Sequence, residues 1–341
     1  MTEQKGTYFP VAHGGIGEYV GHAEPQSADL VYEPVPNWGW LPHGFTFNGD
    51  ATSVAVDSRD RVYVFNRGPI PVLVFESDGT FVAGWGEGEY DVAHGIAIDD
   101  DDRLYLVDRN NFVHRLDADG KVGLTLGSRG VAGRPYSGNG FNNPTDVAIH
   151  PRTGELFVSD GYSNAHVHRY RPDGVHIHSW GGLGDKQGQF SLPHGIEFLD
   201  DERLIVCDRE NHRLEIFSVD GAFLEQWHCH RPSGVRRSKA SGLLYVAEAG
   251  PGVRGRAQLP NLGRRIAIYS PAGERLSQFG HPAPGYGPDQ FVSPHSVAVD
   301  STGAVYVAEV NRTLTVAVLG EEPPRGERPS LRKWRLVRPS R

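Results

Sequence analysis

Short runs of alternating apolar and polar residues recur along the chain and divide it into six similar copies. Each copy has one such run, an Asp/Gly-rich turn, and a second run that ends in Asp, Glu or Asn. Most copies continue with a third run, a turn such as Ser-Asp-Gly, and a last run that ends in Trp-Gly, Leu-Gly or Phe-Gly. An alternation of period two between turns predicts β-strands. The copies read TSVAVDSRDRVYVFNRG from Thr52, AHGIAIDDDDRLYLVDRN from Ala93, PTDVAIHPRTGELFVSDGY from Pro144, PHGIEFLDDERLIVCDREN from Pro193, PSGVRRSKASGLLYVAEAG from Pro232 and PHSVAVDSTGAVYVAEVNR from Pro294.

Six copies of a four-stranded meander predict an all-β fold, a six-bladed β-propeller with antiparallel blades. A single blade buries only one face, so the blades must stack on one another and close into a ring. The sixth copy has no outer strand of the usual kind after Val318, and we expect residues 31–40 to supply it by pairing the two chain ends. The predicted organisation is an N-terminal extension (1–30), a propeller (31–320) and a basic C-terminal tail (321–341) that is mobile or docks a partner.

Composition restricts the function classes. The 43 glycines and 24 prolines suit many strands and turns. A formal net charge of −8 argues against a nucleic-acid-binding surface, which needs a basic face. The first residues contain no apolar signal segment, and no apolar run approaches the length of a membrane span, so we expect a cytoplasmic protein that does not bind membranes. Cys207 and Cys229 are then expected to be free thiols.

Histidine occupies one equivalent position in alternate copies. Aligned at this position of the first strand, the six copies carry Thr52, His94, Thr145, His194, Ser233 and His295. The first strand of a propeller blade lines the central channel, so these residues form a ring around the axis. Three imidazoles from alternate blades would converge and leave an open coordination position, as a catalytic zinc ion requires. A single histidine is more often a surface or hydrogen-bonded residue, but chance rarely fills three alternate positions and spares the other three.

A second ring position follows the residue that ends each second strand. It carries Arg67, Arg109 and Arg209, and in the third copy Tyr162 lies close to it. A guanidinium group binds a carboxylate through two parallel hydrogen bonds, so these residues predict an anionic substrate. A phenol beside a metal ion and arginines can act as a base. The alternative is that the Asp-Arg pairs are salt bridges between blades, which applies to Arg109 and equally to Arg213.

The copies resemble a known family. Together with FNNPTDVAI, FVSDGYSNAHVHRY, FSLPHGIEF, VCDRENHRLEIF and FVSPHSVAV, they look like the NHL-type propellers of peptidyl-α-hydroxyglycine α-amidating lyase and its bacterial relatives. The resemblance covers residues 53–311 and is most specific in the third and fourth copies. That family splits a carbinolamide into a carboxamide and glyoxylate with a zinc ion held by three histidines. The resemblance thus implies His94, His194 and His295 as the zinc ligands, in agreement with the ring.

The resemblance also implies roles for the polar residues and shows where the chain departs from the family. Tyr162 matches the catalytic tyrosine, and Arg67 and Arg209 match the two active-site arginines. Ser296 stands where the animal lyases have an aspartate that helps to bind a structural calcium ion, so a calcium site is not carried over. Ser293 replaces a methionine, and the disulfides, secretory signal and monooxygenase domain of the animal enzymes have no counterpart here, so peptide amidation as such is not expected.

We therefore predict a metal-dependent lyase, most simply a zinc enzyme, acting on a small α-hydroxyglycine-like molecule with a carboxylate. Tyr162, Arg67 and Arg209 would be catalytic, and Arg67, Arg109 and Arg209 would bind the substrate. Imidazole ligands also suit manganese, iron and nickel. Two alternatives stay open: a metal-dependent hydrolase such as a lactonase, in which the metal generates hydroxide, and a non-catalytic scaffold that binds a protein partner across one face. The oligomeric state is left open.

Overall fold

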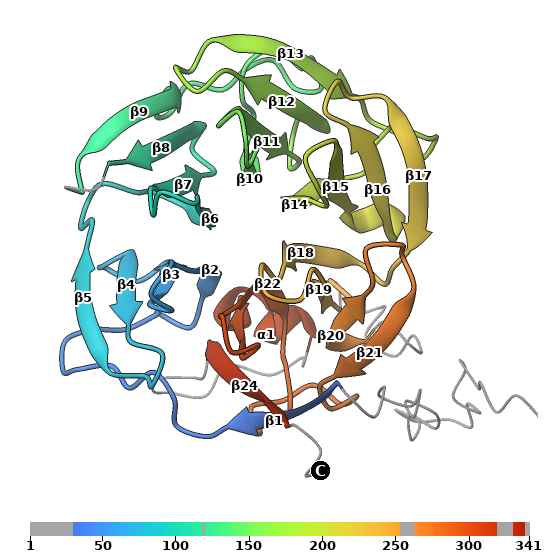
Figure 1. Cartoon of the computed structure of the whole chain (residues 1–341). Coiled ribbons are helices and arrows are strands. Elements are labelled where there is room, and N and C mark those ends of the chain that lie inside the picture. Colours follow the sequence, from blue (N-terminus) through green and yellow to red (C-terminus); the bar gives the residue numbers. More distant parts are fainter. Residues whose placement is uncertain (1–29, 118–119, 253–262, 319–329, 338–341) are drawn as a thin grey trace, which may run out of the picture.

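The computed structural model describes residues 30–117, 120–252, 263–318 and 330–337, which form a ring of six four-stranded antiparallel sheets (Figure 1). This confirms the six-bladed propeller. The strands of the first five blades lie side by side in chain order, and the first strand of each blade is innermost. These blades are β2–β5 (Ala51–Val56, Val62–Asn66, Val72–Phe75, Phe81–Trp85), β6–β9 (Ala93–Ile98, Leu104–Asp108, Phe112–Leu116, Val122–Gly127), β10–β13 (Pro144–Ile149, Leu156–Asp160, His166–Tyr170, His176–Gly181), β14–β17 (Pro193–Phe198, Arg203–Asp208, Arg213–Ser218, Phe223–His228) and β18–β21 (Pro232–Arg237, Leu244–Ala249, Arg264–Tyr269, Arg275–Phe279).

The sixth blade closes the ring with both ends of the chain. Its strand order is β22 (Pro294–Val299), β23 (Val305–Glu309), β24 (Leu331–Val337) and β1 (Val31–Val35). The pairing of β1 with β24 confirms that an N-terminal segment supplies the outer strand.

The third strand of this blade corrects the predicted domain boundary. β24 lies in the segment that the sequence analysis assigned to a C-terminal tail. Its side chains explain the difference, because Trp334 is only 2% exposed and packs against Phe279 and Phe291 of the blade interface. The rest of the predicted tail (321–329 and 338–341) and nearly all of the N-terminal extension lie outside the described residues.

Each interface between neighbouring blades contains its own apolar cluster. Ile96 and Leu106 of the second blade pack with Phe65 of the first, for example, and the five other interfaces contain equivalent groups of buried Val, Ile, Leu, Phe and Tyr. Apolar burial between sheets is therefore distributed around the ring, which is why one blade alone would leave its apolar faces in water.

A β-bulge near the start of each first strand re-aims the residue at the ring position. In the second blade the pairing with the second strand slips between Ala93 and Gly95, and all six blades show a slip at the same place. A bulge leaves one residue out of the ladder and turns its side chain. His94 therefore points into the channel, while Ile96 is fully buried between the blades.

Two further findings concern the predicted setting of the protein. Cys207 and Cys229 are both buried free thiols, as expected. None of the described helices combines the length and apolar character that a bilayer crossing needs.

Candidate metal centre

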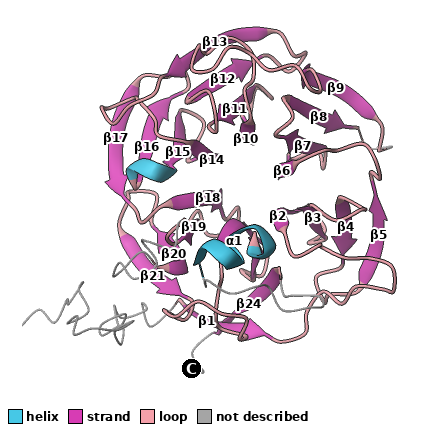
Figure 2. Ribbon diagram, turned by 180° about the vertical axis from the view of Figure 1, so that it is seen from behind, coloured by secondary structure: helices cyan, strands magenta, loops and turns pink. Residues whose placement is uncertain are grey.

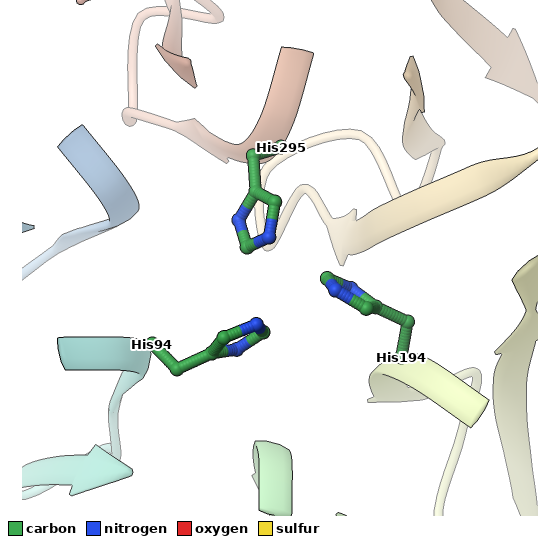
Figure 3. Close-up of side chains that lie close together, drawn as sticks. All are labelled: His94, His194 and His295. Atoms are coloured by element: carbon green, nitrogen blue, oxygen red, sulfur yellow. The ribbon is translucent and has the colours of Figure 1, made fainter. Parts of the chain in front are cut away.

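Three histidines from alternate blades converge on the channel axis (Figure 3). They are His94 of β6, His194 of β14 and His295 of β22, and their ring centroids lie 4.7 to 4.8 Å apart. One ring nitrogen from each lies within 4.8 Å of the others, and the side chains are almost completely buried. Three atoms no more than 4.8 Å apart can all lie within about 2.8 Å of one point, so shifts below about 1 Å would give the bond lengths of ~2.0–2.1 Å that zinc prefers.

Backbone carbonyl groups of the neighbouring blades set the orientation of the three rings. Each Nδ1 lies 2.5 to 2.6 Å from one of these oxygens: His94 from Thr145, His194 from Ser233 and His295 from Thr52. A carbonyl oxygen can only accept, so Nδ1 carries the proton, and each ring presents the lone pair of Nε2 towards the axis. In metalloproteins generally, a hydrogen bond from the ring nitrogen that does not bind the metal orients the histidine.

The electrostatic environment keeps the imidazoles neutral, which is the form that binds a metal ion. Burial is the largest effect and lowers the pKa of all three imidazoles; nearby arginines lower it further, as do neighbouring histidines for His94 and His194. The pKa of His295 falls to about 3. The site fits a divalent transition metal because it offers three neutral nitrogen ligands without displacing a proton from the axis.

Two of the small hydroxyl residues between the histidines, Thr145 and Ser233, connect neighbouring first strands around the axis. Thr145 Oγ1 lies 3.0 Å from the carbonyl oxygen of Pro193, and Ser233 Oγ donates to the carbonyl oxygen of Pro294 at 2.8 Å. These two prolines precede His194 and His295 directly. Thr145 and Ser233 therefore hold one histidine through their carbonyl group and contact the strand of the next one through their hydroxyl group.

The predicted polar residues gather beside the histidines on one face of the propeller, which we call the arginine face. It is defined by Arg67, Arg109, Tyr162 and Arg209. Each of these four residues comes just after the second strand of its blade. The last residue of that strand pairs with the residue before the position that holds a histidine in alternate blades, as Asp108 pairs with Ala93, which precedes His94. Antiparallel pairing thus brings the residues after the second strand next to the ring. The short helix η1 (Arg209–Asn211) and helix α1 (Asn311–Val318) lie on this face (Figure 2).

The phenol of Tyr162 lies next to the three-histidine cluster. Its Oη is 3.2 Å from Nε2 of His94 and 3.3 Å from Nε2 of His194. Burial opposes ionisation of the phenol, but the charges of Arg209, Arg109 and Arg67 outweigh it, and the pKa of Tyr162 lies below its ordinary value. The phenol is therefore placed to exchange a proton with a molecule bound at the ring.

The three arginines differ in their partners. Arg67 pairs with Asp50 at 3.3 Å, and Arg209 pairs with Glu210 at 2.9 Å. Arg109 stacks on Tyr162, with Cζ 3.7 Å from the ring centroid.

Arg109 has no acidic partner within 4 Å among the described side chains, and its buried Nε has no hydrogen-bond partner there. The salt-bridge alternative thus does not apply to Arg109. Arg213 does form such a pair, at 2.8 Å from Asp208, but within the fourth blade and not between blades. Three guanidinium groups with two acidic partners make the arginine face favourable for an anion.

Two residues of this network were missed by the sequence analysis. Glu210 accepts hydrogen bonds from Arg209 and from Arg231, which lies 2.8 Å away at the start of the fifth blade. These guanidinium groups outweigh the effect of burial and lower the pKa of Glu210 to about 2. The position of Glu210 directly after Arg209 was a signal in the sequence, whereas the contact with Arg231 spans 21 residues and depends on the fold.

Comparisons with known proteins place the chain among NHL-repeat proteins, and several of its relatives are named as amidating lyases or amidating monooxygenases. The NHL repeat model matches residues 190–217, which include His194. Peptidyl-alpha-hydroxyglycine alpha-amidating lyase 1 of Drosophila melanogaster is 32% identical over 286 residues, which cover 75% of this chain and 50% of that protein. NHL repeat-containing protein 3 of Mus musculus is 30% identical over 291 residues, which cover 80% of each chain.

A longer relative and a solved structure extend these matches. Peptidylglycine alpha-amidating monooxygenase of Rattus norvegicus is 27% identical over 337 residues, which cover 86% of this chain. This chain spans 32% of the rat protein's length. The solved structure of a gluconolactonase from Xanthomonas campestris has a TM-score of 0.54 at 19% identity, covers 86% of this chain and 89% of its own, and supports the fold alone.

Proposed function

Because the chain belongs to the NHL-repeat family of β-propeller proteins, we propose that its channel holds a metal-dependent lyase centre. The substrate would be a small carbinolamide of the α-hydroxyglycine type, and the products a carboxamide and glyoxylate or a similar carbonyl compound. The observation that carries this proposal is the convergence of three Nε2 lone pairs beside the phenol of Tyr162. The named activity of the amidating-lyase relatives is its second support.

His94, His194 and His295 would hold the metal ion, for which zinc is the expected identity. When bound, such an ion supplies Lewis acidity, which polarises and acidifies a hydroxyl group. The carbonyl groups of Thr145, Ser233 and Thr52 keep the three rings in the tautomer that this role needs.

Tyr162 is the residue placed to move the proton. Its phenolate oxygen takes the proton of the substrate hydroxyl, and the bond between the hydroxyl-bearing carbon and the amide nitrogen then breaks. That carbon becomes the carbonyl carbon of glyoxylate, while the leaving nitrogen receives the proton back from Tyr162. Atoms and charge balance without a water molecule, which separates this elimination from a hydrolysis.

The arginine face supplies the site for the carboxylate. Arg67 and Arg209 already contact acidic side chains, whereas the buried Nε of Arg109 has no acceptor among the residues that the structure describes. An unsatisfied buried donor is unfavourable, so a carboxylate that reaches Arg109 would gain a charge-assisted hydrogen bond. The carboxylate end of the substrate would then lie beside Tyr162.

The test is product formation from α-hydroxyhippurate by protein loaded with zinc. We expect benzamide and glyoxylate in equal amounts, above the spontaneous rate without protein, and one metal ion per chain by elemental analysis. Benzoate in place of benzamide would identify a hydrolase, and turnover of a lactone without glyoxylate release would favour the lactonase alternative.

A matched pair of variants separates the centre from general effects of histidine loss. His194→Ala should lose metal and activity. His150→Ala removes another buried histidine, which bonds to the carbonyl oxygen of Asp201 at the far end of its strand. We expect this control to retain both properties. Unchanged metal content in His194→Ala would refute the proposed centre and leave the non-catalytic scaffold.

A further inference from the structure

Deeper in the channel, one arginine joins the first strands of four blades. Arg236 of β18 places its two terminal nitrogens 2.8 and 3.0 Å from the carboxylate oxygens of Asp146 in the third blade. The same nitrogens donate to the carbonyl oxygens of Ile96 in the second blade at 3.0 Å, Ile196 in the fourth at 3.3 Å and Val235 in its own blade at 2.8 Å. The Arg236 and Asp146 side chains are 12% and 9% exposed.

The position of Arg236 in its blade carries alanine in four of the other five blades and a glutamate in one. Arg236 lies three residues after the ring position of its blade. The other five blades carry Ala55, Ala97, Ala148, Glu197 and Ala298 at that position. The alignment of the six copies shows one arginine at this position, but it does not show what that arginine contacts.

The contacts of Arg236 end next to the metal centre. Ile96 and Ile196 come two residues after His94 and His194 in the same strands. Asp146 directly follows Thr145, whose carbonyl oxygen holds Nδ1 of His94. The planar guanidinium of Arg236 bonds to the strands of Ile96, Asp146 and Ile196 and so fixes the distances between them. Rigid support of this kind determines how well a metal site keeps its geometry.

The oxygen atoms around Arg236 are of the kind that bind calcium. The Asp146 carboxylate, several backbone carbonyl groups and the nearby carboxylate of Glu197 are the kind of oxygen ligands that Ca²⁺ prefers. In this structure the guanidinium already bonds to Asp146 and to these carbonyl groups, and its pairing with Asp146 outweighs the cost of burial and raises the pKa of Arg236. Ser296, in the same ring as Asp146, offers only a hydroxyl group, which contacts Ser53 Oγ at 3.0 Å. The residues present therefore do not fit a calcium ion.

We propose that Arg236 is a positioning residue that acts as a built-in axial cation: it fixes the spacing of His94 and His194 and excludes a structural calcium ion. The positioning role rests on the proposed metal centre, whereas the exclusion of calcium does not. A matched control exists at the outer part of the propeller. Arg169 also joins two blades, with contacts of 2.7 to 2.9 Å to Glu155, Asp220 and the carbonyl group of Val219, and its side chain is 15% exposed.

The first experiment measures the melting temperature of the full chain with 5 mM CaCl2 or with EGTA. We expect no difference for the wild type, and a clear rise with CaCl2 would overturn the exclusion of calcium. Arg236→Met should lower the melting temperature by about 5–10 °C because it leaves Asp146 buried without its partner. A loss below 1 °C would overturn the tie between blades.

The second experiment uses Co²⁺ in place of the native metal and records its visible absorption bands, which report ligand geometry. We expect Arg236→Met to bind Co²⁺ about 10–100-fold more weakly with altered bands, and Arg169→Met to keep the wild-type spectrum. Equal spectra in wild type and Arg236→Met, or equal changes in both variants, would overturn the positioning role. If Arg236→Met does not fold, Arg236→Lys, which keeps the charge but not the two-fold contact, should show the same direction of change, and a wild-type spectrum there would overturn it. Failure of the wild type to bind Co²⁺ would refute the metal centre, while the calcium measurement would still stand.

Discussion

Gly95 offers a way to disturb a histidine without touching the histidine itself. It follows His94 in β6, where the first strands of the second and third blades approach closely. A Cβ atom at Gly95 would lie 2.7 Å from the carbonyl oxygen of Thr145 and 2.9 Å from Cα of Asp146. An ordinary contact needs roughly 3.4 Å or more, so Gly95→Ala would push that carbonyl group away by about 0.7 Å. The same oxygen holds Nδ1 of His94 at 2.6 Å.

Two separate losses should follow from Gly95→Ala, one in stability and one in metal affinity. Overpacking between strands costs about 1–3 kcal/mol of unfolding free energy. Loosening of the contact that orients a metal-binding histidine lowers metal affinity by about 10–100-fold, which corresponds to roughly 1.4–2.7 kcal/mol. The loss of affinity should therefore be measurable in a protein that still folds.

The assay is a competition for Zn²⁺ against a chromophoric chelator, combined with calorimetric melting of the metal-free protein. Gly133→Ala is the control, because its Cβ would lie 2.3 Å from the carbonyl oxygen of Asn139, in a loop that holds no histidine ring. We expect the control to lose stability and to keep its affinity. If Gly95→Ala melts earlier than the wild type but binds Zn²⁺ equally well, the carbonyl contact does not orient His94 and the reasoning fails.

Three further variants test other parts of the site and the fold. Tyr162→Phe should lower kcat about 10²–10⁴-fold with unchanged metal content, because the proton carrier is lost; steady-state glyoxylate release with elemental analysis checks this, and a kcat near that of the wild type would exclude the assigned role. Arg109→Met should raise KM more than it lowers kcat, because Arg109 has no acidic partner among the described side chains and can bind the substrate carboxylate. Arg109→Lys should lie between the two, and an unchanged KM would argue against this contact. Burial raises the pKa of Glu215 to about 7, above its value in the unfolded chain, so the folded state binds this proton more tightly and the free energy of unfolding should fall as pH rises from about 4.5 through 7. Urea unfolding at pH 5 and pH 8 should show a smaller fall in Glu215→Gln, and an equal fall would assign the pH dependence to other groups.

The candidate site shows how far the repeat pattern reaches. Alignment of the copies predicted that His94, His194 and His295 share one position on alternate blades, and the structure brings them together. The sequence also showed that Thr145 and Ser233 alternate with the histidines, but not that their carbonyl groups accept hydrogen bonds from Nδ1. Every residue has a backbone carbonyl group, so residue type does not reveal such a bond.

Contacts between distant residues were the part that the sequence left open. Arg231 reaches Glu210, and Arg236 reaches Asp146 over 90 residues, so each pair becomes visible only when neighbouring or opposite blades are placed in space. The C-terminal strand is a similar case. Leu331–Val337 belongs to no full copy, and only the open edge of the sixth blade makes it a strand.

Local order along the chain was enough for the number of blades, the order of their strands and the ring positions, because side-chain alternation and turn residues repeat with each copy. The tertiary structure decided the tautomer of each imidazole, the lowered pKa of Tyr162, the Arg109 donor without an acceptor among the described residues, and the axial contact of Arg236. These properties depend on distances between atoms of different blades and on exclusion of water, and both arise only when the ring is closed.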